Sequence, residues 1–276
     1  LEPPGGGRMR IALVGCGAAG RPLGRVWIGA GHELGAVRAC SRAAEAVAAM
    51  GGGVPDGSLD GADVVVFATP DDVLAAVASH TPLRPEQVAL HLSGAVPSGV
   101  LELTGARTAS LHPLCAFADL ETSVAMLPGT FFFVEGEAVE VAERLARDAG
   151  GRPVRLRPDR KTLYHAGAAV ASNYLVTLLA LARDLFTAAG VDEGVALEAL
   201  GRLGAGALRN VLEVGIPRGL TGPVARGDVE VVARHLDALD PDARELYRAL
   251  LRATIPLARA KGGLSAEAAR ALRGLV

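Results

Sequence analysis

The stretch RIALVGCGAAG, residues 10–20, decides the fold of this chain. Its first five residues form a short apolar run, which is typical of a buried strand, and glycines end that run. The spacing G-x-G-x-x-G, directly after a strand and at the start of a helix, is the pattern that binds a dinucleotide. Gly15 allows a tight turn, Gly17 lets a pyrophosphate approach the backbone, and Gly20 lets the helix pack closely on the strand.

The other positions of this turn lie at the N-terminus of the expected helix, whose N–H groups would face the phosphates. The predicted cofactor-binding turn is therefore Gly15, Cys16, Gly17, Ala18, Ala19 and Gly20. The alternative is an ordinary strand-to-helix turn in a chain with 35 glycines.

The residues after the second expected strand, 34–40, select the cofactor. An acid there would bind the ribose 2′-hydroxyl of NAD, whereas an arginine accommodates the 2′-phosphate of NADP. The sequence has Ser41 and Arg42 at this point and no acid. We therefore expect NADP(H), unless Arg42 only begins the next helix at the surface.

Strand and helix patterns alternate through the first half of the chain. Apolar runs predict strands over residues 10–14, 34–40, 63–68, 88–92, 108–111, 130–134 and 153–156. Helices are expected between them, over residues 18–28, 42–50, 71–80, 96–103 and 139–149. Apolar strands that alternate with helices predict an α/β fold with a doubly wound, mostly parallel Rossmann sheet covered on both faces.

Only helical patterns follow residue 157. They cover residues 159–189, 193–203, 205–213, 229–239, 241–261 and 266–275. We therefore expect a dinucleotide-binding domain over residues 9–157 and an all-α domain for substrate binding and dimerisation over residues 158–276.

Polar residues follow three of the expected strands. Strand ends of such sheets border the ligand crevice, so these residues are candidates for binding or catalysis. Thr69 and Pro70 are expected beside the nicotinamide ribose, or else to form a plain connection to the next helix. Ser93 would orient a substrate, and His112 would exchange a proton, unless it only caps the turn before Pro113.

Further candidates lie in the helical half. His165 and Ser172 are seven residues apart and share one helix face, with Asn173 beside it. These polar groups need partners, either within the protein or in a ligand. Arg226, in the loop 220–228, would pair with a substrate carboxylate, or with Asp228 to shape the loop.

The composition excludes several classes of protein. The net charge of −2 gives no basic excess for nucleic-acid binding. Three cysteines are too few and too scattered for a disulfide framework or a zinc site, which favours the cytoplasm. The uncharged stretch 166–182 is too short and too polar for a membrane span, so we expect a buried helix and no membrane.

Several motifs in their order resemble a known bacterial family. They are the glycine turn, ATPDD (68–72), LSGA (92–95), SLHP (110–113), YHAGAAVASNY (164–174) and LTGPVARGD (220–228). The chain resembles predicted NADP-dependent oxidoreductases that have a Rossmann-like N-terminal domain and a helical C-terminal domain of unassigned function. That group is similar to the 6-phosphogluconate dehydrogenase-like superfamily, which includes pyrroline-5-carboxylate reductases, β-hydroxyacid dehydrogenases and prephenate dehydrogenases.

The resemblance implies a homodimer with the long helix at the interface. It also implies roles for two residues, since prephenate dehydrogenases carry a serine after one strand and a catalytic His-Pro after the next, like Ser93 and His112. The catalytic lysine of β-hydroxyacid dehydrogenases is absent, because position 169 is alanine.

These observations predict an NADP(H)-dependent oxidoreductase that transfers a hydride to or from a small carbonyl, imine or hydroxy compound in a cleft between the domains. His112 would move the proton, Ser93 would orient the substrate, and Asn173, His165 and Arg226 would bind it. One alternative is a non-catalytic NADP-binding sensor or scaffold dimer, and another is a protein that binds a deazaflavin cofactor.

Overall fold

A computed structural model describes residues 7–39 and 42–276 of the chain. Contacts divide the chain into two compact units, Leu1–Ser172 and Asn173–Val276. The strands of the first unit end at Arg155, close to the expected change at residue 157, but the compact unit continues through one further helix.

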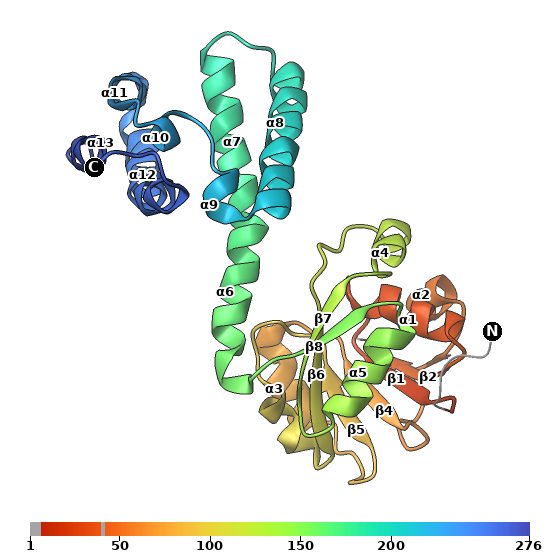
Figure 1. Cartoon of the computed structure of the whole chain (residues 1–276). Helices are drawn as coiled ribbons and strands as arrows, with labels where there is room; N and C mark the ends of the chain where they lie inside the picture. The colour runs from red at the N-terminus through yellow and green to blue at the C-terminus, as the bar shows by residue number, and fades with distance from the viewer. Residues whose placement is uncertain (1–6, 40–41) are drawn as a thin grey trace. The chain divides into compact units, whose positions relative to one another are not determined.

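The first unit is built on an eight-stranded sheet (Figure 1). Its strands are β1 (Arg10–Val14), β2 (Glu33–Arg38), β3 (Val54–Pro55), β4 (Val64–Phe67), β5 (Val88–His91), β6 (Arg107–Pro113), β7 (Phe131–Gly136) and β8 (Arg152–Arg155). They lie in the order β3-β2-β1-β4-β5-β6-β7-β8. All neighbouring pairs are parallel except β6 and β7. The expected α/β fold with a mostly parallel Rossmann sheet is confirmed.

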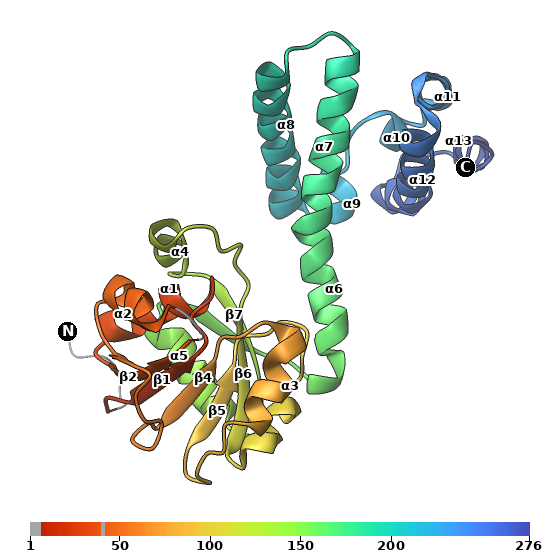
Figure 2. The same cartoon turned by 180° about the vertical axis from the view of Figure 1, so that it is seen from behind.

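Helices cover both faces of this sheet (Figures 1 and 2). The core on one face includes side chains of α1 (Gly20–Gly29), α2 (Ala43–Met50) and α5 (Val139–Asp148). The other face is covered by α3 (Asp71–Ser79) and the 3₁₀ helix η1 (Ser98–Thr104). The indole N–H of Trp27 donates to the carbonyl of Leu145 at 2.9 Å and ties α1 to α5.

Two short elements depart from the sequence expectations. No strand is expected between residues 50 and 63, but Val54–Pro55 pairs with β2 at the edge of the sheet. Helix α4 (Leu120–Met126) has no counterpart among the expected elements, and Asp119 caps it by accepting a hydrogen bond from the N–H of Thr122. Both elements are short, so neither shows a clear periodic pattern in sequence.

The expected helix over residues 159–189 is interrupted. A 3₁₀ turn, η2 (Pro158–Arg160), leads into α6 (Lys161–Ala171), and α7 (Asn173–Ala188) follows. Ser172 between them has φ −118° and ψ −70°, which departs from helical geometry. The first compact unit ends at this residue, so α6 belongs with the sheet.

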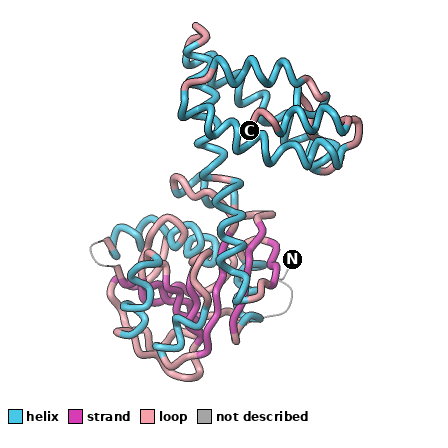
Figure 3. The backbone as a smooth tube through the Cα atoms, turned by 90° about the vertical axis from the view of Figure 1, so that its left-hand side faces the viewer, coloured by secondary structure: helices cyan, strands magenta, loops and turns pink. Residues whose placement is uncertain are grey.

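The second unit is helical wherever it has regular structure (Figure 3). Its helices are α7, α8 (Glu193–Val214), α9 (Ile216–Gly219), α10 (Pro223–Arg226), α11 (Val229–Ala238), α12 (Pro241–Lys261) and α13 (Ala266–Arg273). Two helices expected over 193–203 and 205–213 form the single helix α8, because Gly204 continues the helix instead of ending it. A core that includes Val232, Leu251 and Leu272 holds α11, α12 and α13 together.

One helical stretch, Pro158–Ala188, is long and apolar enough to cross a membrane by length and composition alone. None of its most apolar window is buried inside the chain, so the expectation of a buried helix is wrong for the single chain.

Candidate active site

The glycine turn adopts the geometry that its sequence predicts. Gly15 has φ +89°, and its N–H donates to the carbonyl of Arg38 at 2.7 Å, which holds the turn against the end of β2. A Cβ at Gly15 would lie 2.5 Å from the carbonyl oxygen of Ala68, and one at Gly20 would lie 2.8 Å from the Cβ of Ala68. Both positions therefore require glycine.

Gly17 has a different environment. The nearest atom to a Cβ there would be the carbonyl oxygen of Ala68, at 3.6 Å, which is ordinary contact. Packing within the chain therefore does not explain this glycine. A bare backbone that is open to a ligand does explain it, as in other dinucleotide turns.

A cavity of about 660 Å³ opens over this turn. It is lined by residues from the ends of β1, β2 and β4, including Gly15, Cys16, Gly17, Arg38, Arg42, Asp56, Thr69 and Pro70. A smaller cavity of about 220 Å³ shares Cys16, Gly17 and Arg42 and adds Arg21. Ala18 is exposed, and Ala19 occupies the N-cap position of α1.

The candidates for cofactor selection lie where the strand ends. Arg42 is exposed and borders both cavities. Ser41 lies outside the described residues. Sequence reasoning missed Arg38, whose Nε donates to the carbonyl of Gly57 at 3.0 Å, and Asp56 on the same cavity wall.

Thr69 and Pro70 follow β4, as expected, and line the larger cavity. The Thr69 hydroxyl oxygen is buried and has no hydrogen-bond partner in the part of the chain that the structure describes. Buried polar atoms normally have partners, so this hydroxyl is available to a bound molecule.

A second group of polar residues surrounds the end of β6. His112 lies in β6, and its Nδ1 is 2.6 Å from the hydroxyl oxygen of Tyr164 in α6. The two rings meet edge to face, with centroids 5.7 Å apart. Tyr164 also packs against Phe133, with centroids 4.3 Å apart, and Phe133 is the partner of His112 in the β6–β7 ladder. The Tyr164 ring is therefore held at a fixed place beside His112.

Gly94 brings His112 and His165 to one point. A Cβ at Gly94 would lie 2.7 Å from Nε2 of His112 and 2.8 Å from Cδ2 of His165. The neighbouring Ser93 hydroxyl accepts hydrogen bonds from the N–H groups of Ala95 and Val96, at 3.1 and 3.0 Å. Three predicted site residues, Ser93, His112 and His165, thus lie together in the first unit.

The environment shifts the protonation of this group. Burial, together with the smaller effects of the positive charge of Lys161 and of the neighbouring His165, lowers the pKa of His112 to about 4. Burial raises the pKa of Tyr164 to about 12. Near neutral pH, His112 is therefore a neutral imidazole beside a protonated phenol.

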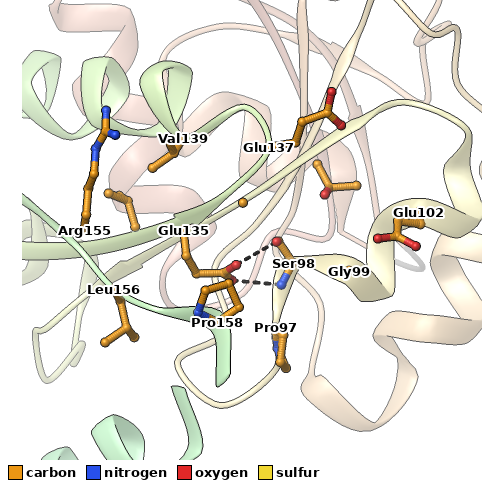
Figure 4. A pocket seen from close by; sticks show the side chains of 13 residues that line it. Pro97, Ser98, Gly99, Glu102, Glu135, Glu137, Val139, Arg155, Leu156 and Pro158 are labelled. Carbon is orange, nitrogen blue, oxygen red and sulfur yellow. Dashed lines mark hydrogen bonds between the residues drawn. The ribbon is translucent and has the colours of Figure 1, made fainter. Parts of the chain in front are cut away.

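A buried ionic network lies next to this pair. Nζ of Lys161 is 3.0 Å from Oε1 of Glu135, each side chain is 1% exposed, and Nζ also donates to the Ser110 hydroxyl. The Glu135 carboxylate accepts from the N–H and the hydroxyl of Ser98, at 2.8 and 2.7 Å. Figure 4 shows Ser98 and Glu135 pointing toward one another at the wall of a further cavity of about 620 Å³.

Sequence reasoning missed this network and Tyr164. It also missed His91, which is fully buried at the end of β5 and accepts a hydrogen bond from the N–H of Ser93 at 3.1 Å. One signal was available for Lys161, because the chain has only two lysines and relies on arginine for its other basic side chains.

The remaining candidates belong to the second unit. Asn173 begins α7 and is exposed. Arg226 ends α10 and pairs with Asp228 at 2.8 Å, which is the loop-shaping contact considered above. Their predicted roles in substrate binding stay predictions.

Comparison with known proteins adds a family match and several similar folds. Residues 130–254 match a family described as Domain of unknown function (DUF2520), and this range contains Glu135, Lys161, Tyr164 and His165. No curated protein matches the chain.

Among solved structures, protein TM1727 from Thermotoga maritima is 26% identical, with a TM-score of 0.76 over 91% of this chain and 99% of that chain. BF3122 from Bacteroides fragilis, a candidate NADP oxidoreductase, is 21% identical, with a TM-score of 0.73 over 90% and 98%. A 1-pyrroline-5-carboxylate reductase from Streptococcus pyogenes is 14% identical, with a TM-score of 0.62 over 97% and 96%. These matches cover both units of the chain.

Proposed function

We propose that this chain, which carries a DUF2520 domain over residues 130–254, is an NADP(H)-dependent oxidoreductase. It transfers a hydride to or from a small carbonyl, imine or hydroxy compound. The observation that carries the proposal is the open glycine turn under the larger cavity, on the same edge of the sheet as the His112–Tyr164 pair. The similar fold of a pyrroline-carboxylate reductase and of a candidate NADP oxidoreductase supports it.

The residues of the cavity fit a phosphorylated dinucleotide. The backbone at Gly17 is open to a pyrophosphate, and the unpartnered Thr69 hydroxyl offers a hydrogen bond to a ribose. Arg38 and Arg42 supply two guanidinium groups near the end of β2 against the single carboxylate of Asp56, which favours a 2′-phosphate.

His112 donates the proton that the reduction of the substrate requires. NADPH, when bound, supplies the hydride. A hydride that reaches the carbon of a carbonyl or imine leaves charge on the oxygen or nitrogen, which must take up a proton. Nε2 of His112 forms no hydrogen bond with a described residue, so it is the ring nitrogen that can give a proton to the substrate oxygen or nitrogen. Ser93 and His165 lie beside it and orient the substrate, while Asn173 and Arg226 are the proposed binding residues of the second unit.

The chain is further proposed to act in the cytoplasm as a homodimer formed through its helical unit. Helices α7 and α8 expose large apolar side chains, among them Val176, Leu203, Leu208 and Leu212, which are 60–77% exposed. A second copy would bury this surface.

Calorimetric titration with NADPH and NADH tests the cofactor half of the proposal. We expect micromolar binding of NADPH, at least tenfold weaker binding of NADH, and loss of this preference in Arg42→Ala. Arg147→Ala, on the exposed side of α5, is the matched control and should bind as the wild type does. If neither nucleotide binds, the proposal is wrong.

The catalytic half is tested by NADPH oxidation with a panel of 2-oxo acids, ketones and cyclic imines. His112→Gln should lower kcat by a factor of about 10² or more, with NADPH affinity unchanged. NADPH binding without turnover on any compound would instead favour a sensor or scaffold.

A further inference from the structure

His112 does not stand alone at the proposed site, because Tyr164 is held in a fixed position and is hydrogen-bonded to it. The hydroxyl of Tyr164 is 2.6 Å from Nδ1 of His112, and the tyrosine ring is packed on Phe133. The opposite nitrogen, Nε2, lies against Gly94. The Tyr164 phenol therefore lies at one nitrogen of the imidazole, and Gly94 lies at the other.

We propose that Tyr164 and His112 form a two-residue proton relay. The phenol of Tyr164 donates its proton to Nδ1 of His112, while Nε2 of the same ring delivers its own proton to the substrate. This inference rests on the proposed function. Within it, His112 is the catalytic residue and Tyr164 is a positioning and relay residue that acts through it.

In the proposed relay, the Tyr164 hydroxyl is the donor of this hydrogen bond and Nδ1 of His112 is the acceptor. The Tyr164 hydroxyl has one hydrogen, and Nδ1 is the only acceptor for it among the described residues. A phenol that donates to Nδ1 leaves the proton of the neutral ring on Nε2. The ring therefore presents an N–H group at its free nitrogen.

Burial keeps the phenol protonated, and burial together with the surrounding positive charges keeps the ring neutral. His112 is near His91 of β5 and near Lys161 and His165 of α6, and all three would oppose a positive charge on it. The negative charge of Glu135 in β7 and the charge of Asp71 in α3 act mainly on Lys161. Because the pKa of His112 falls to about 4, an imidazolium is scarce at neutral pH and cannot be the main proton source.

The relay balances without an imidazolium. As a hydride reaches the substrate carbon, the Nε2–H bond breaks and an O–H or N–H bond forms on the substrate. The Tyr164 O–H bond breaks at the same time, and its proton moves to Nδ1, so the imidazole stays neutral. The phenolate that remains takes back the Nδ1 proton while a water molecule protonates Nε2, which restores the phenol and the Nε2–H tautomer with the net uptake of one proton from solvent.

Nitrogen NMR of the imidazole rings tests the proton position without cofactor or substrate. In ¹⁵N-histidine protein at pH 7, we expect His112 as the Nε2–H tautomer with Nδ1 as a hydrogen-bond acceptor. His112→Gln identifies the signal. Tyr164→Phe keeps an aromatic ring packed on Phe133 and removes only the hydroxyl. It should therefore shift the Nδ1 signal of His112 and leave the ring as a mixture of its two neutral tautomers. An Nδ1–H tautomer in the wild-type protein overturns the relay.

The pH profile of reduction tests the proton path. With a ketone from the panel, the wild-type kcat/KM should be flat between about pH 6 and pH 9, because no imidazolium is required. In Tyr164→Phe only an imidazolium can donate, so kcat/KM should fall about tenfold for each pH unit above the pKa of His112. A merely structural role would lower the rate and leave the profile flat, and that result would overturn the relay.

The second unit contains a matched control. Nδ1 of His235 is 2.9 Å from the hydroxyl of Tyr247, and the rings meet edge to face, as in the proposed relay. Tyr247→Phe therefore removes the same contact elsewhere and should leave rate and profile unchanged. Loss of NADPH binding would contradict the proposed function, whereas the tautomer of His112 and the slope of the profile report on the relay, so the two failures are distinguishable.

Discussion

The ammonium group of Lys161 and the carboxylate of Glu135 lie 3.0 Å apart with 1% of each side chain exposed. Removing one partner of a buried ion pair leaves an uncompensated charge, which costs about 3–5 kcal/mol. We therefore expect Lys161→Met to lower the free energy of unfolding by about this amount. The double variant Lys161→Met with Glu135→Gln should recover much of the loss, since the amide oxygen can still accept from Ser98.

The measurement is urea denaturation of the wild-type protein, both single variants and the double variant. The exposed pair Arg202–Glu198, on α8, serves as the control cycle and should give a coupling close to zero. Equal and additive losses in the Lys161–Glu135 cycle would show that the two charges do not stabilise one another.

Gly94 sets the approach of two histidines. A methyl group there would lie 2.7 Å from Nε2 of His112 and 2.8 Å from Cδ2 of His165, so one ring must move. We expect Gly94→Ala to reduce kcat by about 10² while NADPH affinity stays within a factor of three, because a displacement of about 1 Å at a reacting group has this effect. Gly167→Ala, also near the site but with open space around it, is the control. Unchanged kcat in Gly94→Ala would place the reacting atoms elsewhere.

The glycines of the turn should respond differently to alanine. Gly15 has φ +89° and a backbone oxygen 2.5 Å from a Cβ position, so Gly15→Ala should destabilise the first unit as well as abolish binding. Gly17→Ala meets only ordinary contact at 3.6 Å, so the melting temperature should stay within a few degrees while NADPH affinity falls at least tenfold. Differential scanning fluorimetry and calorimetric titration of both variants separate the two effects. If the Gly17→Ala protein binds NADPH normally, the pyrophosphate does not bind against Gly17.

Local patterns predicted the sheet and named Ser93, His112 and His165 as candidates, but they did not predict which side chains pair with one another at the site. Residues 63–68 are almost entirely apolar because β4 is buried on both faces, and the glycine turn has a fixed spacing. The pairing of Lys161 with Glu135, or of Tyr164 with His112, joins residues far apart in the chain and exists only once β6, β7 and α6 have packed. The antiparallel β7 has the same apolar pattern as a parallel strand, and helical periodicity continues across the break at Ser172.

The exposed face of α8 predicts a dimer. Leu208 and Leu212 are one helical turn apart and are 60% and 77% exposed in the single chain. We expect light scattering to give about twice the chain mass of 28.2 kDa for the wild-type protein and the monomer mass for Leu208→Glu with Leu212→Glu. Leu103→Glu, an exposed apolar residue of the first unit, should leave the dimer intact. A wild-type monomer in detergent-free buffer would contradict the proposed assembly.

Buried neutral histidines should make the protein sensitive to acid. Burial, and then the charge of Lys161, lowers the pKa of His91 to about 3, and the pKa of His112 falls to about 4 for the same reasons. In the unfolded chain both rings take up protons near pH 6.5, so between about pH 6.5 and pH 4 the unfolded state binds protons that the folded state does not. The free energy of unfolding must therefore fall as the pH falls, by about 1.4 kcal/mol per pH unit for each such proton.

His112→Gln removes one of these groups and retains a side chain that can bond to Tyr164. We expect urea denaturation between pH 7 and pH 4 to show that the free energy of unfolding falls less steeply with falling pH in this variant than in the wild-type protein. The difference in slope should correspond to about one proton. His80→Gln changes an exposed histidine and serves as the control for the slope. If His112→Gln and the wild type lose stability in parallel, His112 is protonated in the folded protein, and the neutral imidazole on which the proton relay depends is wrong.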